Sequence, residues 1–418
     1  MDVIDADLWR AAVPAGGTAI DPSDPAVLLA ALGPDAESAW QAGLSAGAAV
    51  PEHGPVRVET PQGVAADAVG TFVSGVVAGA RGRGGLLLDG DAPAGAIAIG
   101  NAVDLAKLLT DAPANVLGPV DFAALATDLA GQVGLECTVH DVDSLEQLGC
   151  GGILGIGAGS DRPPRLVDLR YRPAQPIGRI TLAGKGVVFD SGGLSAKSPA
   201  AMMDMRSDKA GAAVVLAVLA VLPSLGLPIE VRGLLPLVEN VPGPHSIRPG
   251  DVVTAADGTE IQVMDTDFEG RVILADALAL AVRERPDLVV DLATLTYQVV
   301  IGLGPEIAGV IGRDAALTAE WVAAGAAAGE AWWPLPYATR YEQQMRTPSG
   351  VRNHPMTDSG RAITAALFLG AFVPQDQPWL HADIAGPTWR GDASAEGATG
   401  FAVRTVIELV TRRTRSNG

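Results

Sequence analysis

Lysine is scarce in this chain of 418 residues, because only four of the 29 basic residues are lysines and arginine supplies the other 25. The four are Lys107, Lys185, Lys197 and Lys209, and three of them lie within residues 185–209. We expect Lys209 at the surface, since it falls in the first turn of a predicted helix. Lys185 and Lys197, in a chain that otherwise uses arginine, indicate a chemical requirement for an amine.

Cysteine and histidine are also few, and neither forms a metal-binding or catalytic pattern. Cys137 and Cys150 make no CxxC pair and no disulfide framework, so we expect buried core thiols. The five histidines have no ligand spacing, and no HExxH motif occurs. By motif, these absences exclude zinc sites built from imidazole or thiolate ligands.

Positive charge is in deficit, and long apolar runs are missing. The net charge is −19, which repels phosphate backbones and anionic lipids and favours divalent cations. The longest apolar stretch, residues 210–222, is shorter than a bilayer span and is predicted to be a buried helix closed by Pro223. The start MDVIDADLWR lacks the features of a signal peptide. We therefore expect a cytoplasmic protein that binds neither nucleic acid nor membrane.

Strands and helices alternate from about residue 104 onward, which predicts an α/β fold. Strands are predicted at 137–140, 152–156, 166–171, 179–189, 229–235, 288–292, 307–311 and 380–384, and helices at 119–132, 209–222, 270–283, 315–329, 361–372 and 399–412. The expected C-terminal domain, residues 104–418, has a mostly parallel mixed sheet flanked by helices. Residues 1–103 are predicted to form a smaller N-terminal α/β domain that ends in a connector helix.

Two strand-to-helix joints concentrate charged residues, at the edge where ligand sites of such sheets lie. The first reads GKGVVFDSGGLSAK at 184–197 and continues to MRSD at 205–208; the second reads DTDFEGR at 265–271. Together they hold four carboxylates, those of Asp190, Asp208, Asp267 and Glu269. Asp267 and Glu269 are two residues apart, a spacing that places both side chains on one side of an extended chain.

Four carboxylates that converge in an apolar domain raise each other's pKa, and a pair of divalent cations removes this conflict. Carboxylate oxygens are suitable ligands for Mg²⁺, Mn²⁺ or Zn²⁺. Lysine fits the same chemistry, because a buried amine can lose its proton and coordinate a metal, whereas arginine stays charged. A second lysine that keeps its charge can polarise a substrate carbonyl. The sequence therefore predicts a two-metal site that uses Lys185 and Lys197.

Three segments resemble the signature regions of the leucine aminopeptidase (cytosol aminopeptidase) family of dinuclear metallopeptidases. They are GKGVVFDSGGLSAK at 184–197, MDMRSDKAGAAVV at 203–215 and DTDFEGRVILADAL at 265–278. Further similarity appears in TDAPANVLGP at 110–119, GCGGILGIGAGS at 149–160, PPRLVDLRY at 163–171, VVDLATLT at 289–296, HADIAGPTW at 381–389 and GATGFAVRT at 397–405. The resemblance implies that residues 104–418 are the catalytic domain of a hydrolase, an aminopeptidase that forms a homohexamer.

The resemblance also implies the metal ligands. They would be Lys185, Asp190, Asp208, Asp267 and Glu269, around two divalent ions that are Mn²⁺ or Zn²⁺, with Mg²⁺ as a further option. Asp190 and Glu269 would bridge the two ions. Lys185 and Asp208 would complete the tighter site, and Asp267 the more readily exchanged one. One ion would bind the free α-amine of a peptide substrate, which makes the enzyme an exopeptidase.

The resemblance further implies roles for two basic side chains, those of Lys197 and Arg271, and for the residues of a substrate pocket. Lys197 would polarise the scissile carbonyl, and Arg271 would hold a bicarbonate that acts as general base toward the metal-bridging water. The substrate-binding candidates are Met205, Thr294, Leu295 and Tyr297.

Two departures from the family pattern bear on the substrate. Where the family has Asn-Thr-Asp-Ala-Glu-Gly-Arg, this chain has Asp265 and Phe268, which add a negative charge and a large ring beside the metals. Where the family has Thr-Leu-Thr-Gly, this chain ends the run with Tyr297, which would narrow the pocket or add a hydroxyl to it. The sequence therefore leaves open a specialised dipeptidase or amide-tailoring hydrolase of the same family. A non-catalytic binding relative is a third reading, against which the intact ligand positions count.

Overall fold

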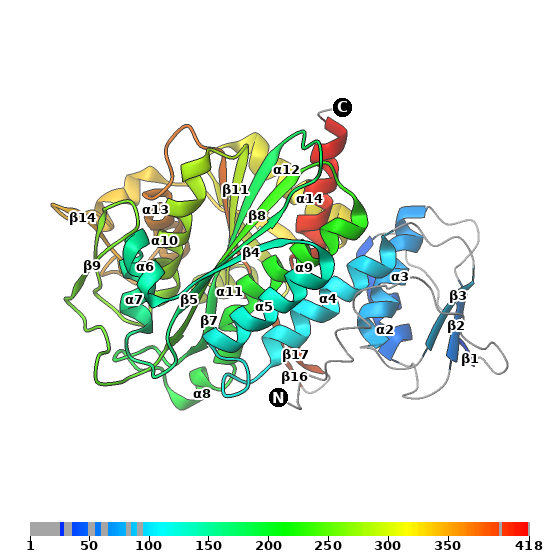
Figure 1. Ribbon diagram of the computed structural model, residues 1–418, viewed down its shortest axis with the longest axis horizontal. Coiled ribbons are helices and arrows are strands. Elements are labelled where there is room, and N and C mark those ends of the chain that lie inside the picture. Colours follow the sequence, from blue (N-terminus) through cyan, green and yellow to red (C-terminus); the bar gives the residue numbers. More distant parts are fainter. Residues whose placement is uncertain are drawn as a thin grey trace.

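A mixed β-sheet runs through the centre of the molecule, with helices on both faces (Figure 1). The structure is a computed structural model that describes residues 26–28, 36–48, 55–59, 66–80, 85–89, 95–392 and 395–416. In spatial order the strands are β13 (Trp332–Pro334), β12 (Ala308–Gly312), β15 (Trp379–Asp383), β11 (Leu288–Ala293), β6 (Arg179–Gly184), β8 (Glu230–Asn240), β5 (Arg165–Tyr171) and β4 (Glu136–His140), while β7 (Gly186–Asp190) also pairs with β8. Strands β15, β11, β6 and β8 are parallel, and antiparallel pairs flank them. The predicted α/β class with a mostly parallel mixed sheet is confirmed.

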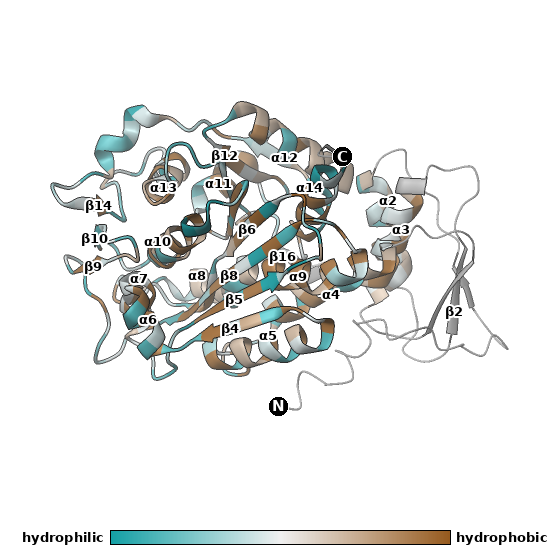
Figure 2. Ribbon diagram, turned by 45° about the horizontal axis from the view of Figure 1, so that its top comes forward, coloured by the Kyte–Doolittle hydropathy of each residue, from teal (hydrophilic) through white to brown (hydrophobic). Residues whose placement is uncertain are grey.

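Buried side chains lie on the two faces of this sheet in two large clusters. Along β11, Leu288, Val290 and Leu292 belong to one cluster, whereas Val289 and Ala293 belong to the other, as the two-residue period of a strand requires. The first cluster includes residues of α4 (Ala96–Asp111), α5 (Pro119–Val133), α9 (Ala210–Leu225), α12 (Ala315–Ala328) and α14 (Val403–Ser416), and the second those of α7 (Gly151–Gly157), α10 (Glu269–Ala281) and α13 (Arg361–Gly370). Figure 2 shows apolar residues in brown along the central strands and the helices packed on them.

Helix α9 is buried on every side, as predicted from its composition. All residues from 210 to 222 are buried, and alanine and glycine let neighbouring backbones approach closely. The helical stretch Met205–Leu225 is long and apolar enough to cross a membrane, with hydropathy 1.7, but 83% of its apolar window is buried inside the fold. The helix does not close at Pro223. It continues to Leu225 and ends where Gly226 adopts a left-handed φ of 60°.

The N-terminal part contains a parallel three-stranded sheet and two helices. Its strands are β1 (Ala26–Leu28), β2 (Pro55–Glu59) and β3 (Gly85–Asp89), in that order, and its helices are α2 (Ala36–Ala48) and α3 (Ala66–Ala80). Helix α4 contacts both α3 and α9, so the helix predicted as the connector spans the predicted division between residues 103 and 104. The division of the chain into domains stays a prediction.

The remaining elements are short. The helices are α6 (Val142–Leu148), α8 (Pro199–Met202), α11 (Tyr297–Leu303), and the 3-10 helices η1 (Met205–Lys209), η2 (Val282–Glu284) and η3 (Thr339–Gln344). Strands β9 (Val252–Thr254), β10 (Glu260–Gln262) and β14 (Gly350–Arg352) form a small sheet, and β16 (Trp389–Asp392) pairs with β17 (Ala395–Ala398).

The strand predicted at 152–156 is wrong, because these residues form helix α7. Its N-cap residue, Cys150, makes no capping hydrogen bond with its side chain. The cap comes instead from Asp276 on α10, whose Oδ2 accepts from the Ile153 amide at 2.8 Å, while its Oδ1 accepts from the Ala256 amide at 2.9 Å. A carboxylate at a helix N-terminus satisfies free amides and interacts favourably with the helix dipole. This partner lies 123 residues away in the chain, so no local pattern revealed the helix.

Residues 179–189 form two strands rather than the single strand that was predicted. Strands β6 and β7 both pair with β8, and Lys185 separates them. The Lys185 amide donates to Leu292 O at 2.9 Å, and its carbonyl accepts from the Ala212 amide at 2.8 Å. The backbone of Lys185 therefore bonds to β11 and to α9, which fixes this residue between the sheet and that helix.

Asp276 makes the stability of the fold depend on pH. Burial raises its pKa to about 7, against about 4 in an unfolded chain, so between these values the folded state binds more protons and stability falls as pH rises. We expect the difference in free energy of unfolding between wild type and Asp276→Asn to decrease by up to about 1.4 kcal/mol per pH unit from pH 4 to 7. Urea denaturation across this range measures it, with exposed Asp128→Asn as the control. A difference that does not change with pH would contradict this assignment.

Candidate metal centre

The predicted site residues gather at the carboxyl ends of parallel strands. Asp190 is the last residue of β7, and Thr294 follows β11 directly. Lys185 lies between β6 and β7, and Glu269 begins α10. Asp208 lies in η1, which leads into α9. This is the edge at which parallel α/β sheets form their ligand sites.

Lys185 is the inner cation of this cluster. Its Nζ lies 2.7 Å from Asp208 Oδ1 and 2.9 Å from Glu269 Oε1, and it donates to Thr294 O at 3.0 Å. Its side chain is only 4% exposed. Burial opposes its charge, but the carboxylates of Asp208 and Glu269 raise the pKa of Lys185 above its ordinary value. The amine is therefore held among carboxylates inside the protein.

Lys197 is the outer cation of the cluster. Its Nζ pairs with Asp190 Oδ2 at 2.8 Å and with Asp267 Oδ1. Its side chain is 15% exposed, more than that of Lys185, so a molecule arriving from solvent reaches Lys197 first. Burial opposes its charge too, but the nearby carboxylates, Asp190 foremost, raise the pKa of Lys197. Its ammonium is charged at neutral pH.

Three carboxylates lie close enough to share a cation. Asp190, Asp267 and Glu269 each offer one oxygen, and these oxygens lie within 4.8 Å of one another. Asp208 Oδ2 and Glu269 Oε2 are buried and have no hydrogen-bond partner among the described residues. Buried carboxylate oxygens without partners are costly. A set of hard oxygen donors with an amine beside it fits divalent cations of the Mn²⁺ or Zn²⁺ type.

Burial and mutual repulsion perturb the four acids. Burial raises the pKa of Asp190 and of Asp208 above their ordinary values. It raises the pKa of Asp267 to about 7, and the charge of Asp190 adds to this effect. Burial also opposes ionisation of Glu269, but the two lysines hold the pKa of that carboxyl below its ordinary value. Perturbed acids concentrated at one edge of a sheet are typical of a functional site.

Asp267 and Glu269 reach the cluster from a turn and not from the extended chain that their spacing suggested. Asp267 lies in the turn and Glu269 begins the helix. Asp265 Oδ1 accepts from the Asp267 amide at 2.9 Å, and the Asn353 side chain donates to Asp265 O at 2.7 Å. Asp265, the acid that this chain has in place of the family's asparagine, thus stabilises the turn that contains Asp267.

Two asparagines that the sequence analysis missed support the cluster. Asp190 Oδ1 accepts from Asn240 Nδ2 at 2.7 Å and from the Gly192 amide at 2.9 Å, where Gly192 adopts a left-handed φ of 85°. Asn240 ends β8, and a polar residue at the carboxyl end of a strand is a signal that the sequence does contain. Asn353 reaches the turn from a segment 88 residues away from Asp265, and no local pattern marks it.

Phe268 packs against arginine side chains. Its ring centroid lies 4.7 Å from Cζ of Arg271, 5.3 Å from Cζ of Arg361 and 4.4 Å from the ring of His354. Arg271 is buried, its Nη1 donates to Asn353 O at 2.9 Å, and its Nε has no partner among the described residues. Burial lowers the pKa of Arg271 to about 10. The large ring expected beside the metals thus packs between two guanidinium groups, a favourable contact when these are desolvated.

The four substrate-binding candidates have different environments. Thr294 joins the cluster, since its Oγ1 donates to Asp208 Oδ1 at 2.7 Å. Leu295 is half-buried and packs against the second core cluster. Tyr297 is 70% exposed at the start of α11. Met205 is half-buried at the start of η1, the helix that carries Asp208.

Lys209 is fully buried, and the expectation that it lies at the surface is wrong. Its Nζ donates to Ala112 O at 2.7 Å and to Arg206 O at 2.8 Å. Ala112 caps α4, so the amine satisfies a carbonyl that the end of a helix leaves free. Burial lowers the pKa of Lys209 to about 7, and Arg206 adds to the shift. Sequence position within a helix did not reveal which side of the helix the core covers.

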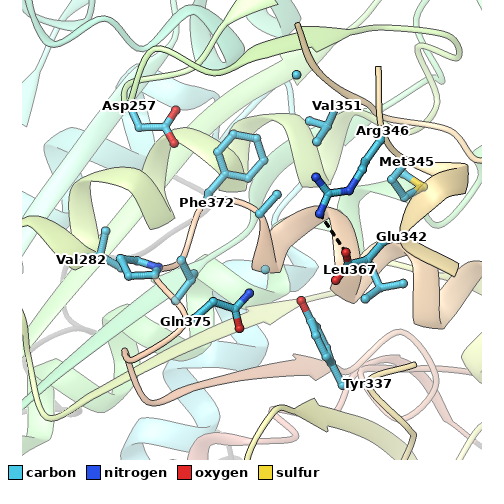
Figure 3. A pocket seen from close by; sticks show the side chains of 15 residues that line it. Asp257, Val282, Tyr337, Glu342, Met345, Arg346, Val351, Leu367, Phe372 and Gln375 are labelled. Carbon is cyan, nitrogen blue, oxygen red and sulfur yellow. Dashed lines mark hydrogen bonds and ion pairs between the residues drawn. The ribbon is translucent and has the colours of Figure 1, made fainter. Parts of the chain in front are cut away.

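A separate cavity of about 510 Å³ lies at the far ends of α10 and α13. Figure 3 shows Phe372 and Val282 at its apolar wall and the ion pair of Arg346 with Glu342 on the other side. No predicted site residue lines it. The charged cluster and this cavity are therefore distinct features.

Known proteins that are similar to this chain belong to the family that its sequence motifs resemble. The sequence model described as "Cytosol aminopeptidase family, catalytic domain" matches residues 104–407. The chain is 42% identical over 316 residues to a "Probable cytosol aminopeptidase" of Syntrophotalea carbinolica, covering 75% of this chain and 63% of that protein. It is 43% identical over 334 residues to the protein of the same name in Micrococcus luteus, covering 77% and 65%. The chain thus spans less than two thirds of the length of these curated relatives.

Two solved structures share the fold across more of the chain. The bottromycin maturation enzyme BotP in complex with Mn superposes with a TM-score of 0.84 at 38% sequence identity, covering 91% of this chain and 88% of that one. A second structure of BotP gives a TM-score of 0.82 with the same identity and coverage.

Gly211 keeps Lys185 in place. A Cβ atom at position 211 would lie 2.1 Å from Leu292 O and 2.8 Å from the Lys185 amide nitrogen, both of them backbone atoms. We expect Gly211→Ala to lower the free energy of unfolding by more than about 2 kcal/mol, because the helix must move away from the sheet. Gly131→Ala in α5 is the matched control, since a Cβ there meets nothing within 4 Å; it should stabilise by roughly 0.5–1 kcal/mol. Equal stabilities in chemical denaturation would contradict the packing described.

Proposed function

The chain belongs to the cytosol aminopeptidase family, and on that premise we propose that it is a two-metal aminopeptidase that releases N-terminal residues from peptides. The observation that carries the proposal is the convergence of Asp190, Asp267 and Glu269 within 4.8 Å of one another. Two lysines pair with these acids, and two buried carboxylate oxygens of the cluster, Asp208 Oδ2 and Glu269 Oε2, have no hydrogen-bond partner in the part of the chain that the structure describes. A hydrolase of this kind is a metallo-exopeptidase.

Five residues would hold the two cations. We propose Lys185, Asp190, Asp208, Asp267 and Glu269 as ligands, with Mn²⁺ or Zn²⁺ as the ions. The Mn in the related BotP structure supports a divalent ion of this size. Two cations bound there would supply a water of lowered pKa as nucleophile near neutral pH, together with an anchor for the free α-amine of the substrate. Lys185 must be deprotonated to act as a ligand. The positive charge of a metal ion beside its amine would favour this loss of the proton.

Lys197 is proposed as the electrophile. It is the more exposed of the two paired lysines, and its raised pKa keeps it charged. A charged ammonium donates a hydrogen bond to the scissile carbonyl oxygen and stabilises the negative charge that develops on it. Lysine suits this role because its charge is compact and its stem is flexible.

Arg271 is proposed to hold a bicarbonate ion that acts as general base. Its buried Nε has no partner among the described residues, so the guanidinium keeps a donor available for an anion. The planar fork of arginine matches a carbonate oxygen pair. The ring of Phe268, 4.7 Å from Cζ, limits the positions that the guanidinium can occupy.

Substrate side chains would contact the segment that follows β11. Thr294 and Leu295 begin this segment and Tyr297 is exposed beside it, so we propose these residues, with Met205, as the wall of the pocket for the first residue. We further propose residues 104–418 as the catalytic domain and a homohexamer as the assembly. The relatives' designation as cytosol aminopeptidases supports a cytoplasmic location.

A second candidate is a specialised member of the same family, such as a dipeptidase or an enzyme that tailors a particular peptide. The likeness to BotP, described as a maturation enzyme, covers 91% of this chain with a TM-score of 0.84. An exposed Tyr297 at the pocket also favours a particular substrate over a general one.

The proposed activity is tested with aminoacyl anilides that carry different first residues. We expect release of the anilide with Mn²⁺ or Zn²⁺ and its loss on chelation, because the cations supply the nucleophile. Substrates acetylated at the α-amine are the matched controls and should resist cleavage. No metal-dependent release from anilides, dipeptides or longer peptides would refute the aminopeptidase proposal. Release confined to one first residue or to dipeptides would favour the specialised enzyme.

The substitution Lys197→Ala tests the proposed role of the Lys197 ammonium as electrophile. We expect kcat to fall by about 10²–10³, as is common when one donor to a developing oxyanion is removed, with metal content near that of the wild type. Lys197→Arg should not restore activity, because the guanidinium is larger and planar. Arg248→Ala, which removes an exposed cation, is the control for a change of net charge. Undiminished kcat in Lys197→Ala would refute its assigned role.

A further inference from the structure

A buried carboxylate, that of Asp383, lies behind the segment proposed to form the substrate pocket. Asp383 ends β15, pairs in register with Ala293 at the end of β11, and is fully buried. Both of its oxygens accept hydrogen bonds from the chain beyond these strands. Oδ1 accepts from the amides of Leu295 and Ala385, each at 3.2 Å, and Oδ2 accepts from Thr296 Oγ1 at 2.7 Å.

These bonds hold a segment that also touches the charged cluster. Thr294 O accepts from Lys185 Nζ at 3.0 Å, and Thr294 Oγ1 donates to Asp208 Oδ1 at 2.7 Å. Thr294 is therefore tied to the cluster, while the next two residues are tied to Asp383. The segment 294–296 connects the two, and α11 with the exposed Tyr297 begins directly after it.

The carboxylate form of Asp383 suits this role, because all three of its partners are donors. An ionised carboxylate only accepts, so it satisfies each of them. Burial raises the pKa of Asp383, but His381, two residues earlier on β15, acts in the opposite direction. His381 Nδ1 in turn lies 2.5 Å from Asp291 Oδ1, and Asp291 Oδ2 accepts from Trp379 Nε1 at 2.8 Å. Asp383, His381 and Asp291 are thus neighbouring buried groups on β15 and β11, each with at least one hydrogen-bond partner.

We infer that Asp383 is a positioning residue that sets selectivity for the first residue of the peptide. It fixes the segment 294–296 through Leu295 and Thr296, and among the described residues no hydrogen bond or ion pair joins it to the cluster of lysines and acids. This inference rests on the proposed function, since it assigns the segment to the substrate pocket. A pocket wall discriminates between side chains only when its backbone is held in one position, and here a single carboxylate holds two consecutive residues.

Three variants separate this role from a general structural one. Asp383→Asn keeps the size but removes the charge: a neutral amide oxygen accepts more weakly from the Leu295 and Ala385 amides, and the amide nitrogen can no longer accept from Thr296 Oγ1. Thr296→Val removes one bond and keeps the shape, and Thr296→Ser restores the hydroxyl. Each is made in the full chain loaded with Mn²⁺, and kcat and KM are measured for a series of first residues.

We expect Asp383→Asn and Thr296→Val to raise KM for the preferred first residue and to reduce the ratio of kcat/KM between preferred and poor residues by about tenfold, the equivalent of about 1.4 kcal/mol. Metal content should stay within about twofold of the wild type, as befits a group that touches no proposed ligand. Thr296→Ser should retain selectivity. An unchanged ratio in Asp383→Asn and in Thr296→Val, or a loss of metal that parallels the loss of activity, would overturn the inference.

A second readout is independent of activity, so that failure of the proposed function is distinguishable from failure of the inference. In hydrogen–deuterium exchange, the Leu295 amide should exchange at least about tenfold faster in Asp383→Asn, because its acceptor is perturbed. Amides of β5, which lies on the other side of the sheet from β15, are the internal control and should not change. If the wild type releases no N-terminal residue, the proposed function fails while exchange still tests the positioning role. Unchanged exchange at Leu295 would overturn that role whatever the activity.

Discussion

The structure depends on one electrostatic constraint, which is that four acidic side chains are brought together where water is largely excluded. Asp190, Asp208 and Glu269 are almost fully buried, and burial works against the ionised form of each. Like charges at such distances cannot all persist without compensating cations. The two paired lysines provide part of this compensation, while Asp208 Oδ2 and Glu269 Oε2 have no hydrogen-bond partner among the residues described. The divalent cations proposed for the site would provide the rest, so the composition of the site and the proposed chemistry follow from the same charge balance.

The fold meets this constraint through rigid packing rather than through the loops alone. Lys185 interrupts one strand so that its backbone can bond both to β11 and to α9. Helix α9, buried on all sides, follows η1 and so carries Asp208 toward Lys185. A residue whose backbone is held by both β11 and α9 cannot relax when its charged neighbours repel one another. This resistance keeps the carboxylates convergent, which flexible loops would not achieve.

The sequence revealed those parts of the site that depend on local order. Lys185, Asp190 and Lys197 fall within one motif, and the alternation of strands and helices correctly placed the central sheet. What it did not reveal depends on partners distant in the chain. The helix α7 was predicted as a strand because Asp276, which caps it, comes from another helix. Asn353 and the buried Lys209 were missed for the same physical reason, since burial is a property of the assembled fold.

The scarcity of lysine gains a wider explanation from the structure. Lys107, Lys185 and Lys209 are all less than 9% exposed, and the side chain of Lys197 is 15% exposed. All four lysines thus lie mainly in the interior, whereas arginine occurs both at the surface and in buried positions such as Arg271 and Arg404. Lys107, Lys185 and Lys209 each donate to a backbone carbonyl, which a compact ammonium on a flexible stem reaches without a planar fork. The positions of the four lysines therefore reflect burial in the first place. Lys185 and Lys197 each pair with two carboxylates of the proposed metal site, and this arrangement is the basis of the chemical roles proposed for them.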